Sequence, residues 1–146
     1  MSNMQLDTLR RIVQEINASV SLHDSLDIMV NHVAEAMHVD VCSIYLLDER
    51  NKRYVLMASK GLKPEAVGHV SLNVGEGLVG LVGKREEIVN LDNAPKHERF
   101  AYLPETGEEL FNSFLGVPVM YRRKVMGVLV VQNQEPQDFS EAAESF

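Results

Sequence analysis

Residues that could bind a metal ion or transfer a proton are sparse in this chain and poorly spaced for either task. The histidines are His23, His32, His38, His69 and His97. No two of them lie four residues apart on one expected helix face with a carboxylate, and no cluster of cysteines and histidines exists. We therefore expect no metal site.

The single cysteine, Cys42, excludes an internal disulfide and any CxxC motif. Its apolar neighbours Val41, Ile44 and Leu46 indicate a small buried residue on a strand. The alternative, a reactive or chromophore-attaching thiol, lacks the nearby positive charge that lowers a thiol pKa. There is also no GxSxG motif, and the paired carboxylates fall in expected turns. We expect no catalytic residue and no cofactor in this segment.

The glycines Gly75, Gly77 and Gly80 match the GxGxxG string of nucleotide-binding proteins. The match is isolated, because no βαβ unit surrounds it and Gly83-Lys84-Arg85 lacks the spacing of a phosphate-binding loop. We interpret these glycines as allowing a tight turn and a close approach of a short helix to a sheet. Backbone amides at such a helix start can bind an anion, although Glu76 would disfavour it.

Composition indicates one soluble domain. The chain has 146 residues, 45% hydrophobic and 24% charged, with a net charge of −7. This charge argues against a nucleic-acid surface, and the basic clusters Arg10–Arg11 and Arg122–Lys124 are short. No apolar run approaches 18 residues and no cleavable leader is present, so we expect no membrane span and a cytoplasmic location.

Two strongly apolar runs, Phe114–Tyr121 and Val125–Gln132, flank the charged triplet Arg122–Lys124. Their β-branched content predicts two antiparallel strands joined by a tight hairpin. Because both runs are apolar at nearly every position, we expect them at the centre of a sheet with cover on both faces. Such a sheet can enclose a small-molecule pocket.

Residues 5–20 predict an amphipathic helix with a heptad seam of Leu6, Leu9, Val13, Ile16 and Val20. The seam fits packing on its own domain or pairing across a dimer. Ser21 is a candidate N-cap, which predicts a second helix to about Met37.

The remaining pattern predicts further strands, a short helix and a long connection. We expect strands at 41–47, 53–59, 69–73 and 88–91, with a short helix at 78–83. The polar stretch 92–112 is long for a connection and is typical of a binding loop or lid. A helix opens at Asp138, and the chain stops at Phe146 after barely one turn. We therefore expect residues 1–146 to be a single domain that is truncated within its C-terminal helix.

Taken together, the chain resembles a GAF domain, a small-molecule sensing module of signalling proteins. The resemblance rests on blocks in the order VCSIYLLD (41–48), GEGLVG (75–80), IVNLD (88–92), FLGVPV (114–119) and MGVLVVQ (126–132). It implies an α+β fold: a roughly six-stranded antiparallel sheet with helices on one face and a pocket-covering segment, about 75–112, on the other. The residue set of cyclic-nucleotide GAF domains and the multiple cysteines of GAF-like methionine-sulfoxide reductases are absent.

Within the family, the stretches 75–83, 90–97, 114–118 and 128–132 are most similar to the N-terminal GAF domains of nitrogen-related phosphoenolpyruvate–protein phosphotransferases. That resemblance implies catalytic domains downstream, and a domain that controls autophosphorylation in response to nitrogen metabolites. Glutamine and 2-oxoglutarate are the implied effectors, and a homodimer through terminal helices is expected. The alternatives are a dimerisation scaffold that binds no ligand and the sensor domain of a nitrogen-fixation transcriptional activator.

The expected pocket combines apolar residues for burial, a glycine for close approach and a few orienting polar groups. The candidate ligand-binding residues are Met57, Leu78, Val79, Asp92, Ala94, Phe100, Phe114, Gly116 and Gln132.

Overall fold

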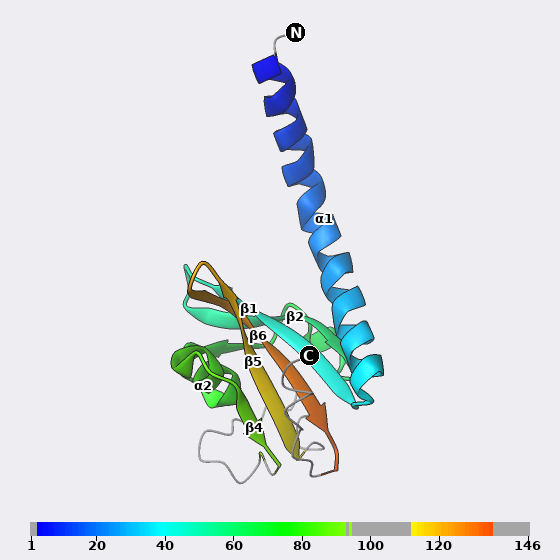
Figure 1. Ribbon diagram of the computed structural model, residues 1–146, viewed down its shortest axis with the longest axis vertical. Helices are drawn as coiled ribbons and strands as arrows, with labels where there is room; N and C mark the ends of the chain where they lie inside the picture. The colour runs from blue at the N-terminus through cyan, green and yellow to red at the C-terminus, as the bar shows by residue number, and fades with distance from the viewer. Residues whose placement is uncertain (1–2, 93, 95–111, 136–146) are drawn as a thin grey trace.

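The computed structural model describes residues 3–92, 94 and 112–135, and of residues 3, 4 and 11–21 it describes the backbone alone. A six-stranded antiparallel sheet carries a long helix on one face and a short helix on the other (Figure 1). The expected α+β fold class is therefore confirmed.

The strands follow the expected positions closely. Their order across the sheet is β3-β2-β1-β6-β5-β4. A short 3-10 helix, η1 (Pro64–Ala66), between β2 and β3 was not predicted. The strands are β1 (Val41–Asp48), β2 (Arg53–Lys60), β3 (Ser71–Asn73), β4 (Val89–Leu91), β5 (Ser113–Tyr121) and β6 (Lys124–Asn133).

The predicted central hairpin is formed by β5 and β6, which pair from Ser113 with Asn133 to Tyr121 with Lys124. Arg122 and Arg123 make its two-residue turn, with φ of 50° and 67°. β6 lies between β1 and β5, but β5 neighbours the edge strand β4. Since the pairing with β4 ends at Gly116, the second half of β5 becomes progressively exposed. Cover on both faces, expected along the whole of both runs, is thus limited on β5 to its first half.

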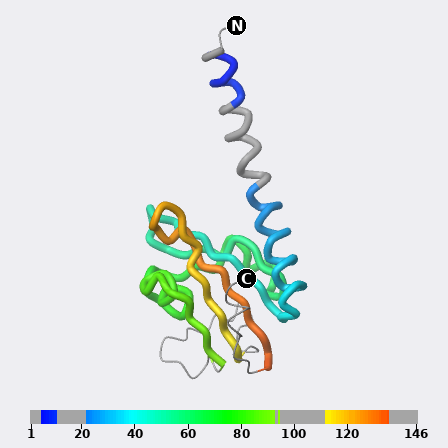
Figure 2. Tube along the Cα trace, viewed as in Figure 1, coloured from blue at the N-terminus to red at the C-terminus, as the bar shows by residue number. Residues whose placement is uncertain are grey.

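The N-terminal region forms one helix, α1 (Asn3–Met37), and not the two helices that we predicted. The helical backbone continues through Ser21, so the interpretation of this residue as an N-cap is wrong. The C-terminal half of α1 packs on the sheet, and its N-terminal half extends beyond it (Figures 1 and 2). Within the described ranges, no helix is both long and apolar enough to cross a membrane.

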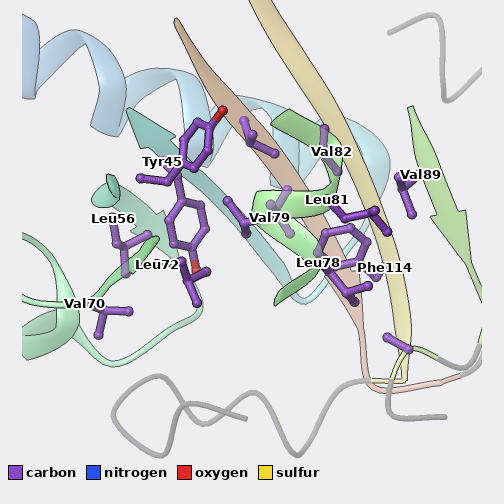
Figure 3. Close-up of a cluster of buried hydrophobic side chains, with 14 of the residues drawn as sticks. Tyr45, Leu56, Val70, Leu72, Leu78, Val79, Leu81, Val82, Val89 and Phe114 are labelled. Atoms are coloured by element: carbon purple, nitrogen blue, oxygen red, sulfur yellow. The ribbon is translucent and has the colours of Figure 1, made fainter. Parts of the chain in front are cut away.

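Two apolar clusters lie on opposite faces of the sheet. On the α1 face, Leu26, Val30 and Val33 of the helix pack with alternate residues of β1, including Cys42 and Ile44. On the other face, α2 (Gly77–Arg85) packs over the remaining alternate residues (Figure 3). Alternation along β1 therefore assigns each of its residues to one face.

Candidate functional site

The glycine motif builds the turn that leads into α2. Gly75 and Gly77 have φ of 88° and 65°, which favour glycine. A Cβ on Gly80 would lie 2.7 Å from the carbonyl carbon of Gly75, so the turn folds tightly against the helix. The predicted tight turn is confirmed, whereas the close contact of the helix with the sheet is made at Gly83 and not at these three glycines. The carboxylate of Glu76 accepts a hydrogen bond from the Asn73 amide at 3.1 Å, so a negative charge already stands beside the helix start.

Gly83 sets the distance between α2 and the sheet. A Cβ at this position would overlap the hydroxyl of Tyr54, a buried residue of β2. Burial, and secondarily the Glu86 carboxylate, raise the pKa of this phenol. Tyr54 therefore acts as a rigid neutral spacer beneath α2.

Six of the nine candidate residues gather on the α2 face. Leu78 and Val79 come from α2, and Phe114 and Gly116 come from β5. All six are buried, and a Cβ on Gly116 would lie 2.6 Å from Cγ2 of Val82. Figure 3 shows Phe114 beside Leu78 in this cluster. The other two are Ala94, which joins the same cluster, and Gln132, which pairs with Phe114 and Val41 in the sheet.

The other three candidates do not join this group. Met57 packs with the α1-face cluster. It follows Leu56 of the α2 face, so ordinary alternation places it on the α1 face, and the irregularity in the β1–β2 ladder puts Ala58 on that same face. Asp92 is exposed to solvent. Phe100 lies outside the described residues.

Sequence reasoning missed two small polar residues on the α2 face, Ser43 and Ser59. Their hydroxyl oxygens are 2.8 Å apart, and Ser43 is completely buried. Ser43 pairs with Val130, two residues from Gln132 on the same face of β6. A serine between two apolar residues of a predicted strand was the available signal.

The group combines apolar surface with uncharged hydrogen-bonding side chains from Ser43, Ser59 and Gln132. Among the residues described, no cluster of three or more His, Cys, Asp or Glu could hold a metal ion. Cys42 lies on the α1 face, and burial raises the pKa of its thiol to about 12, so it is a poor nucleophile. The α2 face therefore carries buried, uncharged polar groups within an apolar surface, and the hydroxyls of Ser43 and Ser59 are hydrogen-bonded to each other.

A polar junction joins this face to the ends of α1 and β6. The Ala94 amide donates to the Asn112 carbonyl at 2.6 Å, and the Asn112 amide donates to the Asn133 carbonyl at 3.0 Å. Asp40, just after α1, donates its amide to Oδ1 of Asn133 and accepts the Gln134 amide at 2.8 Å. Ala94 and Asn112 are therefore bonded together close to the point where β6 meets the end of α1.

Comparison with known proteins identifies a matching family and several similar proteins. The GAF domain model matches residues 21–146. The chain is 45% identical over 141 residues to a protein of the phosphoenolpyruvate-dependent phosphotransferase system of Escherichia coli, covering 97% of this chain and 19% of that protein. It is 28% identical over 138 residues to the Nif-specific regulatory protein of Azospirillum lipoferum, covering 89% of this chain and 21% of that protein. The chain thus spans about a fifth of the length of these curated relatives.

A solved structure extends the similarity to three dimensions. The crystal structure of the GAF domain from an Acinetobacter phosphoenolpyruvate-protein phosphotransferase superposes with a TM-score of 0.78 at 81% identity. The match covers 99% of this chain and 86% of that chain. The fold of this chain therefore matches that of a solved GAF domain of very similar sequence.

Proposed function

Because the chain belongs to the GAF domain family, we propose that it is a regulatory domain that binds a small effector on the α2 face. In this proposal it controls autophosphorylation of a cytoplasmic phosphoenolpyruvate–protein phosphotransferase in response to nitrogen metabolites. The similarity to GAF domains of such enzymes supports the assignment of the parent enzyme. The single observation that supports binding is the buried set Ser43, Gln132 and Phe114 on the α2 face of the sheet.

The polar groups of this face favour glutamine over 2-oxoglutarate. Ser43, Ser59 and Gln132 carry hydrogen-bonding groups without charge, and a side-chain amide can pair reciprocally with the amide of Gln132. Burial of a dianion without a paired cation costs much more than burial of a molecule with no net charge. None of the described residues that we assign to the site is a cation.

Population shift is the proposed mechanism. The effector favours one arrangement of the α2 face, and the junction at Asp40 and Asn133 transmits the preference to α1 and to the chain after β6. The equilibrium moves only as far as the difference in effector affinity between the two arrangements allows.

A thermal-shift titration with glutamine, 2-oxoglutarate and cyclic nucleotides tests binding. A ligand at 100 times its dissociation constant adds about 2.7 kcal/mol, which raises Tm by roughly 5–10 °C in a domain of this size. Gln132→Leu should abolish the shift, and Arg10→Gln, on α1 far from the site, should leave it intact. A saturable effect on phosphoenolpyruvate-dependent autophosphorylation of the longer protein would then establish regulation.

If none of these compounds changes Tm, the result would contradict effector binding and favour the alternative of a dimerisation scaffold. That alternative has its own supporting observation, since Leu6 and Leu9 on α1 are 40% and 49% exposed. Sedimentation equilibrium would then show a dimer that Leu9→Glu dissociates. A sensor domain of a nitrogen-fixation activator is favoured only by the weaker Azospirillum similarity. An ATPase motif in the sequence after Phe146 would support it.

A further inference from the structure

A cavity lies away from the α2-face group, along the outer edge of β2. Its volume is about 440 Å³, within the range of small-molecule pockets. The floor is formed by Ala66 and Val70, which are buried. None of its lining residues was a candidate from the sequence, because they converge only when the segment after β2 folds back.

The walls of this cavity carry an excess of positive charge. Arg53 of β2 and Lys63 of the η1 segment are cationic, and the imidazole of His69 adds a further hydrogen-bonding group. Glu65 is the single carboxylate of the lining. The lining therefore differs in sign from the whole chain, which has a net charge of −7.

Hydrogen bonds hold the cavity in shape. The Arg53 Nε donates to Oγ of Ser71 at 2.8 Å, which orients the guanidinium along the rim. Leu56 anchors the returning segment, because its carbonyl accepts the Gly68 amide at 2.7 Å and its amide donates to the Val70 carbonyl at 3.0 Å. The amides of His69 and Val70 both donate to the Ala66 carbonyl at 3.0 Å. The backbone that carries the lining is thus fixed before any ligand binds.

We propose that this cavity is a binding site for a small oxyanion, a phosphate or carboxylate group of a metabolite. The terminal nitrogens of the Arg53 guanidinium can grip two oxygens of such a group, which a lysine cannot do. Lys63 adds a point charge, Ser71 adds a hydroxyl next to the guanidinium of Arg53, and His69 adds a further polar group. The lining of this cavity shares no residue with the α2-face group.

Titration of inorganic phosphate, and separately of succinate, into the ¹⁵N-labelled chain tests the proposal. We expect saturable shifts of the His69 and Ser71 amides with at least one of the two anions. Phosphate alone would assign the site to phosphorylated metabolites, and succinate would extend it to carboxylates. Both results support an oxyanion site.

Two substitutions in the cavity lining should change the affinity for the anion in opposite directions. Arg53→Gln should weaken binding about tenfold, because it removes both the charge and the fork of donors. Glu65→Gln should tighten binding about threefold, because it removes a repelling carboxylate. Arg10→Gln makes the same chemical change as Arg53→Gln on the distant half of α1 and should leave the dissociation constant unchanged.

Three results would overturn the proposal. The first is a lack of saturable shifts with both anions. The second is binding that Arg53→Gln does not weaken, which would locate the anion elsewhere. The third is an equal loss of anion affinity in Arg53→Gln and Arg10→Gln, which would show that affinity depends only on the net charge of the chain. Circular dichroism of each variant controls for loss of fold.

Discussion

Replacement of Gly116 by alanine tests the close packing of α2 on the sheet. The backbone of Gly116 needs no unusual φ, so its side chain is restricted by space alone. An added Cβ would lie 2.6 Å from Cγ2 of Val82 and 2.7 Å from Cε1 of Phe114. Val82 is completely buried and Phe114 is 3% exposed, so neither side chain can move into solvent.

The expected cost combines two opposing contributions. Glycine within a strand is less stable than alanine by about 0.5–1 kcal/mol, which favours the substitution. Forcing a methyl group into a packed core costs about 1–3 kcal/mol. We expect Gly116→Ala to lower the free energy of unfolding by about 1–2 kcal/mol, and Tm by roughly 2–8 °C.

A double-mutant cycle with Val82→Ala isolates the contact. Val82→Ala alone removes two buried methyl groups and should cost about 2–3 kcal/mol with the cavity that it leaves. In the double variant the methyl group introduced by Gly116→Ala occupies the space of the lost Cγ2, so the double variant should be more stable than the sum of the two single costs predicts. The coupling is then about 0.5–1 kcal/mol in favour of the pair. Rescue stays partial because the Phe114 ring remains.

Urea denaturation of the four proteins measures the cycle. A neutral or stabilising Gly116→Ala would show that α2 does not pack as described. Strict additivity would show that Val82 is not the obstructing group. It would leave open the sequence-based hypothesis that Gly116 admits a ligand close to the backbone.

Three other changes have defined outcomes. Replacing Arg122 with asparagine and Arg123 with glycine should raise the free energy of unfolding by about 1 kcal/mol, because asparagine and glycine adopt positive φ more easily than arginine; urea denaturation with an unchanged m value checks this. Cys42 should resist Ellman's reagent in the folded chain at pH 8 and react when denatured. The pKa of the Cys42 thiol is about 12 in the folded chain, above its ordinary value of 9.0. As the pH rises above 9, the unfolded chain therefore loses the thiol proton before the folded chain does. The free energy of unfolding should then decrease between pH 9 and pH 12. Cys42→Ala should remove this pH dependence of the free energy of unfolding, measured by urea denaturation at a series of pH values. An unchanged pH dependence would contradict its attribution to Cys42. Asp40→Ala should cost about 1 kcal/mol and accelerate hydrogen exchange at the Gln134 amide, while Asp40→Asn, which keeps an acceptor, should not.

The sheet was predictable because its strands are long, β-branched and separated by clear turns. The hairpin of β5 and β6 follows directly from two apolar runs around Arg122–Lys124. The order of the strands was not predicted, because local pattern does not specify which distant strands pair. The division of α1 at Ser21 failed because serine at a helix start and serine within a helix look alike in sequence, and only the continuous backbone distinguishes them.

The candidate site was predictable in part. Buried residues of α2 and β5 were identified because apolar side chains after a glycine turn pack on the nearest sheet. Met57 was expected to line the pocket, but it packs on the α1 face, where ordinary alternation from Leu56 places it. The cavity around Arg53 and Lys63 could not be predicted, because its residues converge through the fold of the η1 segment.

Because α1 is one continuous helix, a small change in its angle at the sheet moves its far end by a larger distance. A helix of 35 residues is about 52 Å long, and the 19 residues before Leu22 account for about 28 Å of it. A tilt of about 5° where the helix rests on the sheet would displace the far end by roughly 2 Å. Since the backbone has no break at Ser21 to absorb such a tilt, the displacement grows with distance from the sheet. A small rearrangement at Asp40 would therefore be amplified mechanically, without any further conformational change along the rod.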